Sequence, residues 1–343
     1  MLEKIGKFLY HTIFINIHAG DKELIVYIER KNTKGLVESE EKVFDTDTIN
    51  DEMKKYINFF TKDTPYFYIS FLDSSTSQGA APTCEHIEIS KFYDKALCKY
   101  GCYNNKWSYY TSKFDLDEIE NDFSDLGLDF VFSPFIILAN FFKDKIESHL
   151  AIFVLIQKDS ISLSIFDTSE LLYAQYICLK DEFETTDEFS IDSDDSDEIT
   201  LEDVPEDSID LDSIDIDDDL DVFGDIEDLD SIEEIDEFTD IEEDLEEEST
   251  SLNQSSHKNT MSESGELFDE DFQMFSLIQA SIKTFYEDEK YNSKFVENIY
   301  IADSIGINGD LKNYLEEEMF LNVYVRQINL GVEISELAQS ELK

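Results

Sequence analysis

The sequence predicts an α/β protein made of two similar cycles of strands and helices, with a long acidic segment inserted in the second cycle. Apolar runs that alternate with polar residues, or continue unbroken for five to seven residues, are typical of strands and are separated by amphipathic stretches typical of helices. Of the 81 acidic residues, 36 fall between residues 181 and 250, where the chain has no Lys or Arg. The remainder is moderately acidic and long enough to form a substantial core.

The first cycle is expected to have the order β-β-β-α-β. Ile13, Ile15 and Ile17 alternate with less apolar residues, and an apolar run at 66–72 suits a sheet covered on both faces. The remaining expected elements are strands over 24–28 and 35–44, a helix after a cap at Thr48 or Asn50, a polar irregular stretch over 73–106, a strand over 107–112 and a helix over 115–126 that ends at Gly127.

The second cycle begins with a short strand at 128–132, after which Ser133 and Pro134 form a cap-and-first-turn pair that opens a helix. Apolar residues at spacings of three and four predict a long helix from about Glu266 to Phe285. The remaining expected elements are three strands over 150–156, 161–165 and 171–179, a strand over 296–302, a helix over 309–320 and a final strand over 321–326.

These patterns predict three regions. The first domain spans 1–127, and the second combines 128–180 with 265–343. The segment 181–264 is predicted to be a disordered insertion, because its self-repulsion and sparse apolar residues cannot offset the cost of ordering the chain. Such a segment either keeps the protein in solution or docks on a basic partner, and it argues against contact with nucleic acid or anionic lipid.

The sequence also predicts where the protein is located and what its cysteines can do. The beginning of the chain has no signal-peptide pattern, and the longest apolar run, 130–142, is too short to cross a bilayer. We therefore expect a cytoplasmic protein that does not insert into the membrane, with thiols in a reducing compartment. Three thiols and an imidazole (Cys84, His86, Cys98 and Cys102) offer zinc ligands at unusual spacing, a disulfide pair, or ordinary thiols.

Three stretches of the chain carry a resemblance to a known family. The strand-then-helix pattern at 129–139, the three-strand meander at 149–177, and the strand, Gly-containing loop, helix and strand at 296–325 resemble the second domain of the actin-like ATPase superfamily. The chain is most similar to the cytoplasmic actin-like proteins of type IV pilus assembly (PilM-type) and type II secretion (GspL-type). The resemblance implies a duplicated ribonuclease-H-like body of two domains.

The chain departs from the ATP-binding members at the loops that hold phosphate and metal. Where those members have an Asp followed by Gly, this chain has Asn16 and His18, and the second such loop at 155–159 has no glycine. The adenosine-side loop corresponds to Asp303, Ser304 and Gly306, with Gly309 further on. If a nucleotide binds, these four residues are the expected contacts; we predict no catalytic residue, no metal site and no cofactor.

The resemblance implies a non-enzymatic scaffold of a type IV pilus, type II secretion or DNA-uptake (competence) machine. Such a scaffold is peripheral to the inner membrane, where it binds the cytoplasmic tail of a membrane protein and the hexameric assembly ATPase. Two alternatives stay open. The first is an active ATPase or phosphotransferase with bound ATP and Mg²⁺, and the second is an acidic adaptor that acts through the segment 181–264.

Overall fold

The computed structural model describes residues 11–20, 22–32, 35–62, 64–85, 87–179, 260–291, 293–307 and 309–342, with side chains from residue 270 onward in the helix that begins at Thr260. Contacts divide the chain into one unit of Met1–Ser190 with Asn259–Lys343 and a second of Ile191–Lys258. The second unit, and with it nearly all of the predicted disordered insertion at 181–264, lies outside the described residues.

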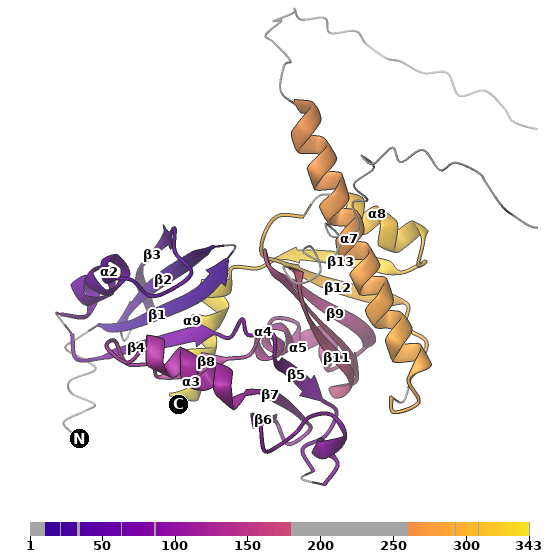
Figure 1. Ribbon diagram of the computed structural model, residues 1–343, viewed down its shortest axis with the longest axis horizontal. Coiled ribbons are helices and arrows are strands. Elements are labelled where there is room, and N and C mark those ends of the chain that lie inside the picture. Colours follow the sequence, from indigo (N-terminus) through magenta and orange to yellow (C-terminus); the bar gives the residue numbers. More distant parts are fainter. Residues whose placement is uncertain are drawn as a thin grey trace, which may run out of the picture. The chain divides into compact units, whose positions relative to one another are not determined.

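The first sheet has the strand order β3-β2-β1-β4-β8 within the described residues (Figure 1). Its strands are β1 (Thr12–Gly20), β2 (Glu23–Asn32), β3 (Gly35–Phe44), β4 (Phe67–Leu72) and β8 (Phe130–Phe132). The hairpins β1–β2 and β2–β3 are antiparallel, whereas β4 is parallel to β1 and β8 is parallel to β4. Ile13, Ile15 and Ile17 are buried on one face, which is why alternating residues predicted this strand.

The second sheet repeats this arrangement with the order β11-β10-β9-β12-β13 within the described residues. Its strands are β9 (Leu150–Ile156), β10 (Ser160–Asp167), β11 (Glu170–Cys178), β12 (Asn298–Asp303) and β13 (Asn322–Gln327). Again a three-stranded antiparallel meander is followed by two parallel strands. Two sheets of this order, one after the other along the chain, form the duplicated ribonuclease-H-like fold, and the predicted actin-like fold class is confirmed.

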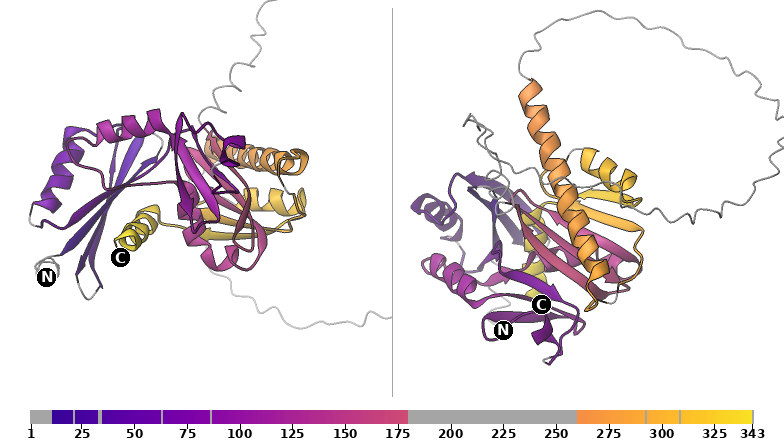
Figure 2. Two further views of the ribbon diagram at one scale, coloured as in Figure 1. Left: turned by 90° about the horizontal axis from the view of Figure 1, so that it is seen from below. Right: turned by 45° about the vertical axis from the view of Figure 1, so that its right-hand side comes forward.

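Helices cover both faces of each sheet (Figure 2). On the first sheet, α2 (Asp51–Thr61) and the end of α3 (Lys113–Asp122) pack on one face, and α9 (Leu330–Glu341) packs on the other. On the second sheet, α7 (Thr260–Glu287) and α8 (Gly309–Glu317) pack on one face, and α4 (Pro134–Phe141), followed by α5 (Lys143–Ile146), packs on the other. Because α4 also contacts α9, one continuous core joins the two sheets.

The stretch predicted to be irregular, 73–106, contains regular structure. It forms β5 (Gln78–Ala81), the short 3₁₀ helix η1 (Ile89–Lys91) and β6 (Cys98–Tyr103). Both strands pair antiparallel with β7 (Trp107–Ser112), the strand that the sequence did predict. The short β5 and the glycine and cysteines of β6 gave no apolar alternation, so partners elsewhere in the sequence determine that these residues are strands.

Four further differences concern the second predicted cycle and the end of the chain. The strand at 130–132, assigned by the sequence to the second domain, pairs with β4 in the first sheet, so the predicted boundary at 127/128 falls before the last strand of that sheet. The helix opened by Ser133 and Pro134 is interrupted at Phe142, between α4 and α5. The long helix α7 begins at Thr260, earlier than the expected start near residue 266. Helix α9 was not predicted at all.

Among the helices that the structure describes, none is both long and apolar enough to cross a bilayer.

Candidate functional site

A cavity of about 500 Å³ lies where the carboxyl ends of several strands meet. Strands β1, β9, β12 and β13 all end beside it, which is where α/β proteins usually bind ligands. Its lining consists of His18, Ala19, Gly20, Glu23, Ile25, Glu41, Gln157, Lys158, Glu270, Asp271, Met274, Ser304, Ile305, Gly306, Ile307, Ile328, Asn329 and Leu330. It is therefore walled by both predicted phosphate loops and by the predicted adenosine-side loop.

The loop after β12 is held together by its own first residue. Asp303 is 1% exposed, and its Oδ1 accepts hydrogen bonds from the N–H groups of Ile305 at 3.0 Å and Gly306 at 2.8 Å. Its Oδ2 accepts from the N–H of Ile307 at 3.0 Å and from Nε2 of Gln327 at 2.9 Å. A buried carboxylate is stabilised by such donors, and this one occupies three backbone N–H groups in a row.

The other predicted contact residues of this loop have different positions. Ser304 lines the cavity, but its hydroxyl donates to the carbonyl oxygen of Ile156 at 2.8 Å. Gly306 also lines the cavity and has a φ of +83°, a conformation that favours glycine. Gly309 is not part of the lining and begins α8. The structure thus brings two of the four residues to the cavity and places Asp303 behind the loop.

The first hairpin brings a neutral histidine to the cavity. His18, 7% exposed, lines it at the end of β1. Burial lowers the pKa of His18 to about 4, and the backbone of Ala19 opposes this shift to a smaller extent. The imidazole is therefore uncharged at neutral pH. It occupies the position at which the resemblance to ATP-binding actin-like proteins led us to expect a glycine.

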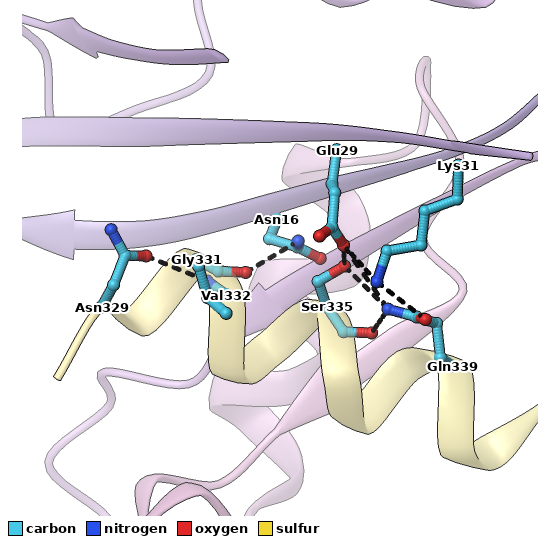
Figure 3. Close-up of polar contacts among 8 residues, drawn as sticks. All are labelled: Asn16, Glu29, Lys31, Asn329, Gly331, Val332, Ser335 and Gln339. Carbon is cyan, nitrogen blue, oxygen red and sulfur yellow. Dashed lines mark hydrogen bonds and ion pairs between the residues drawn. The ribbon is translucent and has the colours of Figure 1, made fainter. Parts of the chain in front are cut away.

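Asn16, at the position expected for an acid, faces away from the cavity toward α9 (Figure 3). Its Nδ2 donates to the carbonyl oxygen of Gly331 at 3.0 Å, and the side chain is completely buried. A Cβ on Gly331 would lie 2.3 Å from Cγ of Tyr27, so glycine allows α9 to approach the sheet this closely. The side chain thus positions a helix in this structure.

A second polar cluster fixes the far end of α9 (Figure 3). The buried Glu29 accepts a hydrogen bond from the hydroxyl of Ser335, and Nζ of Lys31 lies 3.0 Å from its Oε2. Lys31 also donates to Oε1 of Gln339 at 2.9 Å. Sequence reasoning missed this cluster because it missed α9, although Asn329 caps the helix and Leu330, Ile334, Leu337 and Ala338 have helical spacing.

The second hairpin and α7 complete the wall. Nζ of Lys158, in the β9–β10 turn, lies 3.5 Å from Oε1 of Glu23, and both residues line the cavity. On α7, burial raises the pKa of Asp271, an effect that the N–H of Leu311 opposes by donating to Oδ2 at 3.3 Å. The carboxylate of Asp271 thereby caps the start of α8, so it too has a structural partner.

The cysteines follow one of the alternatives left open by the sequence. Cys84 and Cys102 form a disulfide with Cα atoms 5.8 Å apart, whereas Cys98 is free. This pairing contradicts the expectation that the thiols stay reduced. His86 lies outside the described residues, and among the residues that are described no group of three or more His, Cys, Asp or Glu side chains could hold a metal ion.

The duplicated sheets and the cavity at their strand ends define an actin-like protein. The chain belongs to the family described as "Domain of unknown function (DUF8341)", whose model matches residues 152–343. A second family model, described as "Domain of unknown function (DUF8569)", matches residues 10–139. The two models thus divide the chain near the end of the first sheet.

Several solved structures are similar to this chain. A Bacteroides thetaiotaomicron protein with an actin-like ATPase fold and unknown function is 10% identical, with 97% of this chain and 96% of that chain covered and a TM-score of 0.46. The PilM–PilN type IV pilus biogenesis complex is 10% identical, with 93% and 89% covered and a TM-score of 0.45. The ethanolamine utilization protein EutJ from Carboxydothermus hydrogenoformans is 7% identical, with 91% and 84% covered and a TM-score of 0.36. No curated protein matches the chain.

Proposed function

We propose that this protein is a non-enzymatic actin-like scaffold of a type IV pilus, type II secretion or DNA-uptake machine. In this proposal it lies at the cytoplasmic face of the inner membrane and links the tail of a membrane protein to the hexameric assembly ATPase. The machine and both partners come from the resemblance of the stretches 149–177 and 296–325 to PilM- and GspL-type proteins. The stretch 129–139 adds less, because its strand closes the first sheet.

One observation carries the non-enzymatic part of the proposal. Asp303 accepts hydrogen bonds from the N–H groups of residues 305, 306 and 307, so the loop expected to approach a nucleotide has its donors already occupied. A bound nucleotide would have to compete with a buried carboxylate for these donors, and its phosphates would be repelled by that charge. The hydroxyl of Ser304 is occupied in the same way by Ile156.

The phosphate side of the cavity supports the same reading. Catalysis of phosphoryl transfer requires positive charge or a bound metal beside the phosphates. Here Asn16 binds α9, His18 is neutral at pH 7, and Lys158 faces Glu23. None of these three residues supplies a free charge of the required sign to the cavity.

The first experiment measures binding and hydrolysis of ATP with Mg²⁺ by the full chain. We expect no saturable binding at millimolar ATP and no hydrolysis above the buffer rate. Tight binding that is lost in a folded Asp303→Ala variant would favour the rival ATPase or phosphotransferase function. Thermal denaturation of the variant distinguishes loss of binding from loss of the loop, because Asp303 holds that loop in place.

The second experiment tests the scaffold role. The tagged full chain is purified from solubilised membranes, and co-purifying proteins are identified by mass spectrometry. We expect an inner-membrane pilus or secretion protein and a hexameric assembly ATPase, both retained when the segment 181–264 is deleted. Loss of both partners on deletion would instead favour the acidic adaptor, and recovery of neither from the intact chain would overturn the proposal.

A further inference from the structure

The cavity at the strand ends has a strongly acidic lining. Glu23, Glu41, Glu270 and Asp271 all line it, and they come from β2, β3 and α7. Lys158 is the basic residue of the lining, and Glu23 lies 3.5 Å from it. The cavity therefore carries an excess of negative charge, which attracts cations and repels phosphates.

A second observation, independent of the carboxylates, points to a ligand. Gln157 lines the cavity and is 5% exposed, yet its Nε2 has no hydrogen-bond partner among the described residues. Its Oε1 is 3.5 Å from the hydroxyl of Ser160, a group that can donate or accept. If the amide turned by about 180°, Nε2 would donate to the hydroxyl of Ser160 and Oε1 would face the cavity as an acceptor for a ligand.

The size and the other lining groups indicate the kind of cation. A cavity of about 500 Å³ is far larger than one ion and falls in the range that holds a side chain or a small organic ligand. Ile25, Met274 and Ile307 supply apolar contacts beside the carboxylates. The neutral imidazole of His18 adds a potential acceptor without positive charge. An apolar stem that ends in several N–H donors matches this combination.

We propose that the cavity binds the cationic side chain of an arginine or lysine on a partner protein. The proposal rests on the scaffold function, since it names the chemistry by which a partner would occupy the cavity that a nucleotide fills in ATP-binding relatives. The guanidinium or ammonium group lies among Glu41, Glu270 and the amide of Gln157. The stem of the side chain packs on Ile25 and Ile307.

The test uses a probe with one charge, because the 36 acidic residues of the segment 181–250 would bind any polycation. N-acetyl-arginine amide is titrated into the full chain, with N-acetyl-citrulline amide as the neutral probe of the same shape, and binding is followed by ligand-observed NMR. About 0.15 M salt limits diffuse attraction to roughly 8 Å. We expect saturable binding of the arginine probe and at least tenfold weaker binding of the citrulline probe.

Variants locate the site. Glu270→Gln should weaken binding about threefold and Glu41→Gln with Glu270→Gln about tenfold, as expected for loss of partly exposed charges. Gln157→Leu should weaken it about fivefold. Glu297→Gln is the matched control, since this exposed acid precedes β12 at the end of the strand away from the cavity, and it should leave binding unchanged.

Three outcomes would overturn the inference. Equal binding of the two probes would remove the role of charge, and equal binding by Glu270→Gln and Glu297→Gln would place the probe elsewhere. Saturable binding of Mg²⁺ alone that Glu270→Gln abolishes would assign the cavity to a metal. Each of these outcomes leaves the scaffold proposal standing, whereas ATP binding in the cavity would overturn both.

Discussion

The two sheets share one strand order, but they differ in the contacts on the faces that α9 and α4 cover: the first sheet has polar contacts there and the second has aromatic packing. On the first sheet, Asn16, Glu29 and Lys31 bind α9 through hydrogen bonds, and Glu29 and Lys31 also form an ion pair with each other within β2. On the second sheet, a row of aromatic rings crosses the strands: Phe166 meets Phe153 edge to face, and Phe153, Tyr300 and Tyr324 stack. The same topology thus accommodates directional polar contacts at one sheet–helix interface and closely packed rings at the corresponding interface of the other sheet.

The two kinds of contact differ in how precisely they position the helix that they hold. Rings packed at centroid distances of 5.4 Å, as in Phe153 and Tyr300, contribute area and shape but little positional exactness along the strand. A hydrogen bond to a buried carboxylate favours one position of the helix, because a shifted α9 would take the hydroxyl of Ser335 away from Glu29 and leave Lys31 of the same strand as its partner. Directional hydrogen bonds therefore determine where α9 lies on the first sheet, whereas burial of apolar area holds α4 on the second sheet.

The largest effect is expected from Phe153→Ala. The ring is fully buried and contacts the rings of Phe142, Phe166 and Tyr300, so its removal leaves a cavity in the second sheet. Denaturant unfolding should show a loss of about 3–5 kcal/mol. Phe295→Ala, at a ring that is 79% exposed, is the control and should change the free energy of unfolding by less than about 0.5 kcal/mol.

A somewhat smaller loss is expected at the first sheet from Gly331→Ala. The new Cβ would lie 2.3 Å from Cγ and 2.4 Å from Cβ of Tyr27, so helix and sheet must separate. We expect a loss of about 3 kcal/mol on thermal or denaturant unfolding. Gly309→Ala meets nothing within 4 Å and should be close to neutral. Equal effects of the two substitutions would contradict close packing of α9.

Removing the ion pair on the same face tests its polar character. Lys31→Met keeps the length of the side chain but leaves the buried Glu29 without the ammonium group 3.0 Å away. The expected loss is about 2 kcal/mol, since the pair is only partly exposed to solvent. Lys312→Met, which breaks the more exposed pair with Glu316, should cost less than about 0.5 kcal/mol.

The smallest effect is the dependence of stability on His18 and pH. Because the folded pKa is about 4 and the unfolded value is 6.5, the unfolded chain binds more protons between these values. The contribution of His18 is therefore fully present above pH 6.5 and is lost as pH falls toward 4. Between pH 7 and 5 the loss should be on the order of 1–2 kcal/mol.

This pH effect is read as a difference between two proteins, because the many carboxylates titrate in the same range. Chemical denaturation of the wild type and of His18→Gln is measured at pH 7 and pH 5. The gap in unfolding free energy between wild type and variant should change by the stated amount, with the wild type losing more. A constant gap would mean that the imidazole can become charged in the folded protein.

Much of the fold could be predicted from local pattern. Alternation at Ile13, Ile15 and Ile17 marked β1, and Asn50 and Ser133 cap helices as expected, their side chains accepting from the N–H groups of Met53 and Phe135. What failed depends on partners distant in sequence. The strand β8 has only three residues and belongs to the first sheet because it meets β4, which no local pattern records.

The candidate site was predictable in its location and less so in its chemistry. Ser304 and Gly306 line the cavity as expected for the adenosine-side loop. The inward turn of the Asp303 carboxylate onto its own loop depends on backbone geometry that residue types alone do not specify. Glu41 and Glu270 reach the cavity from elements remote in sequence, so spacing could not connect them to Gln157.

The position of α9 has a consequence for synthesis on the ribosome. The strands of the first sheet lie between residues 12 and 132, but the helix that covers one of their faces spans 330–341. A nascent chain therefore carries an unfinished sheet, with Phe14 and Leu72 lacking their cover, while some two hundred further residues are translated. The acidic segment is synthesised during that interval. Its negative charge would repel other nascent chains and so oppose aggregation until α9 covers the exposed face of the first sheet.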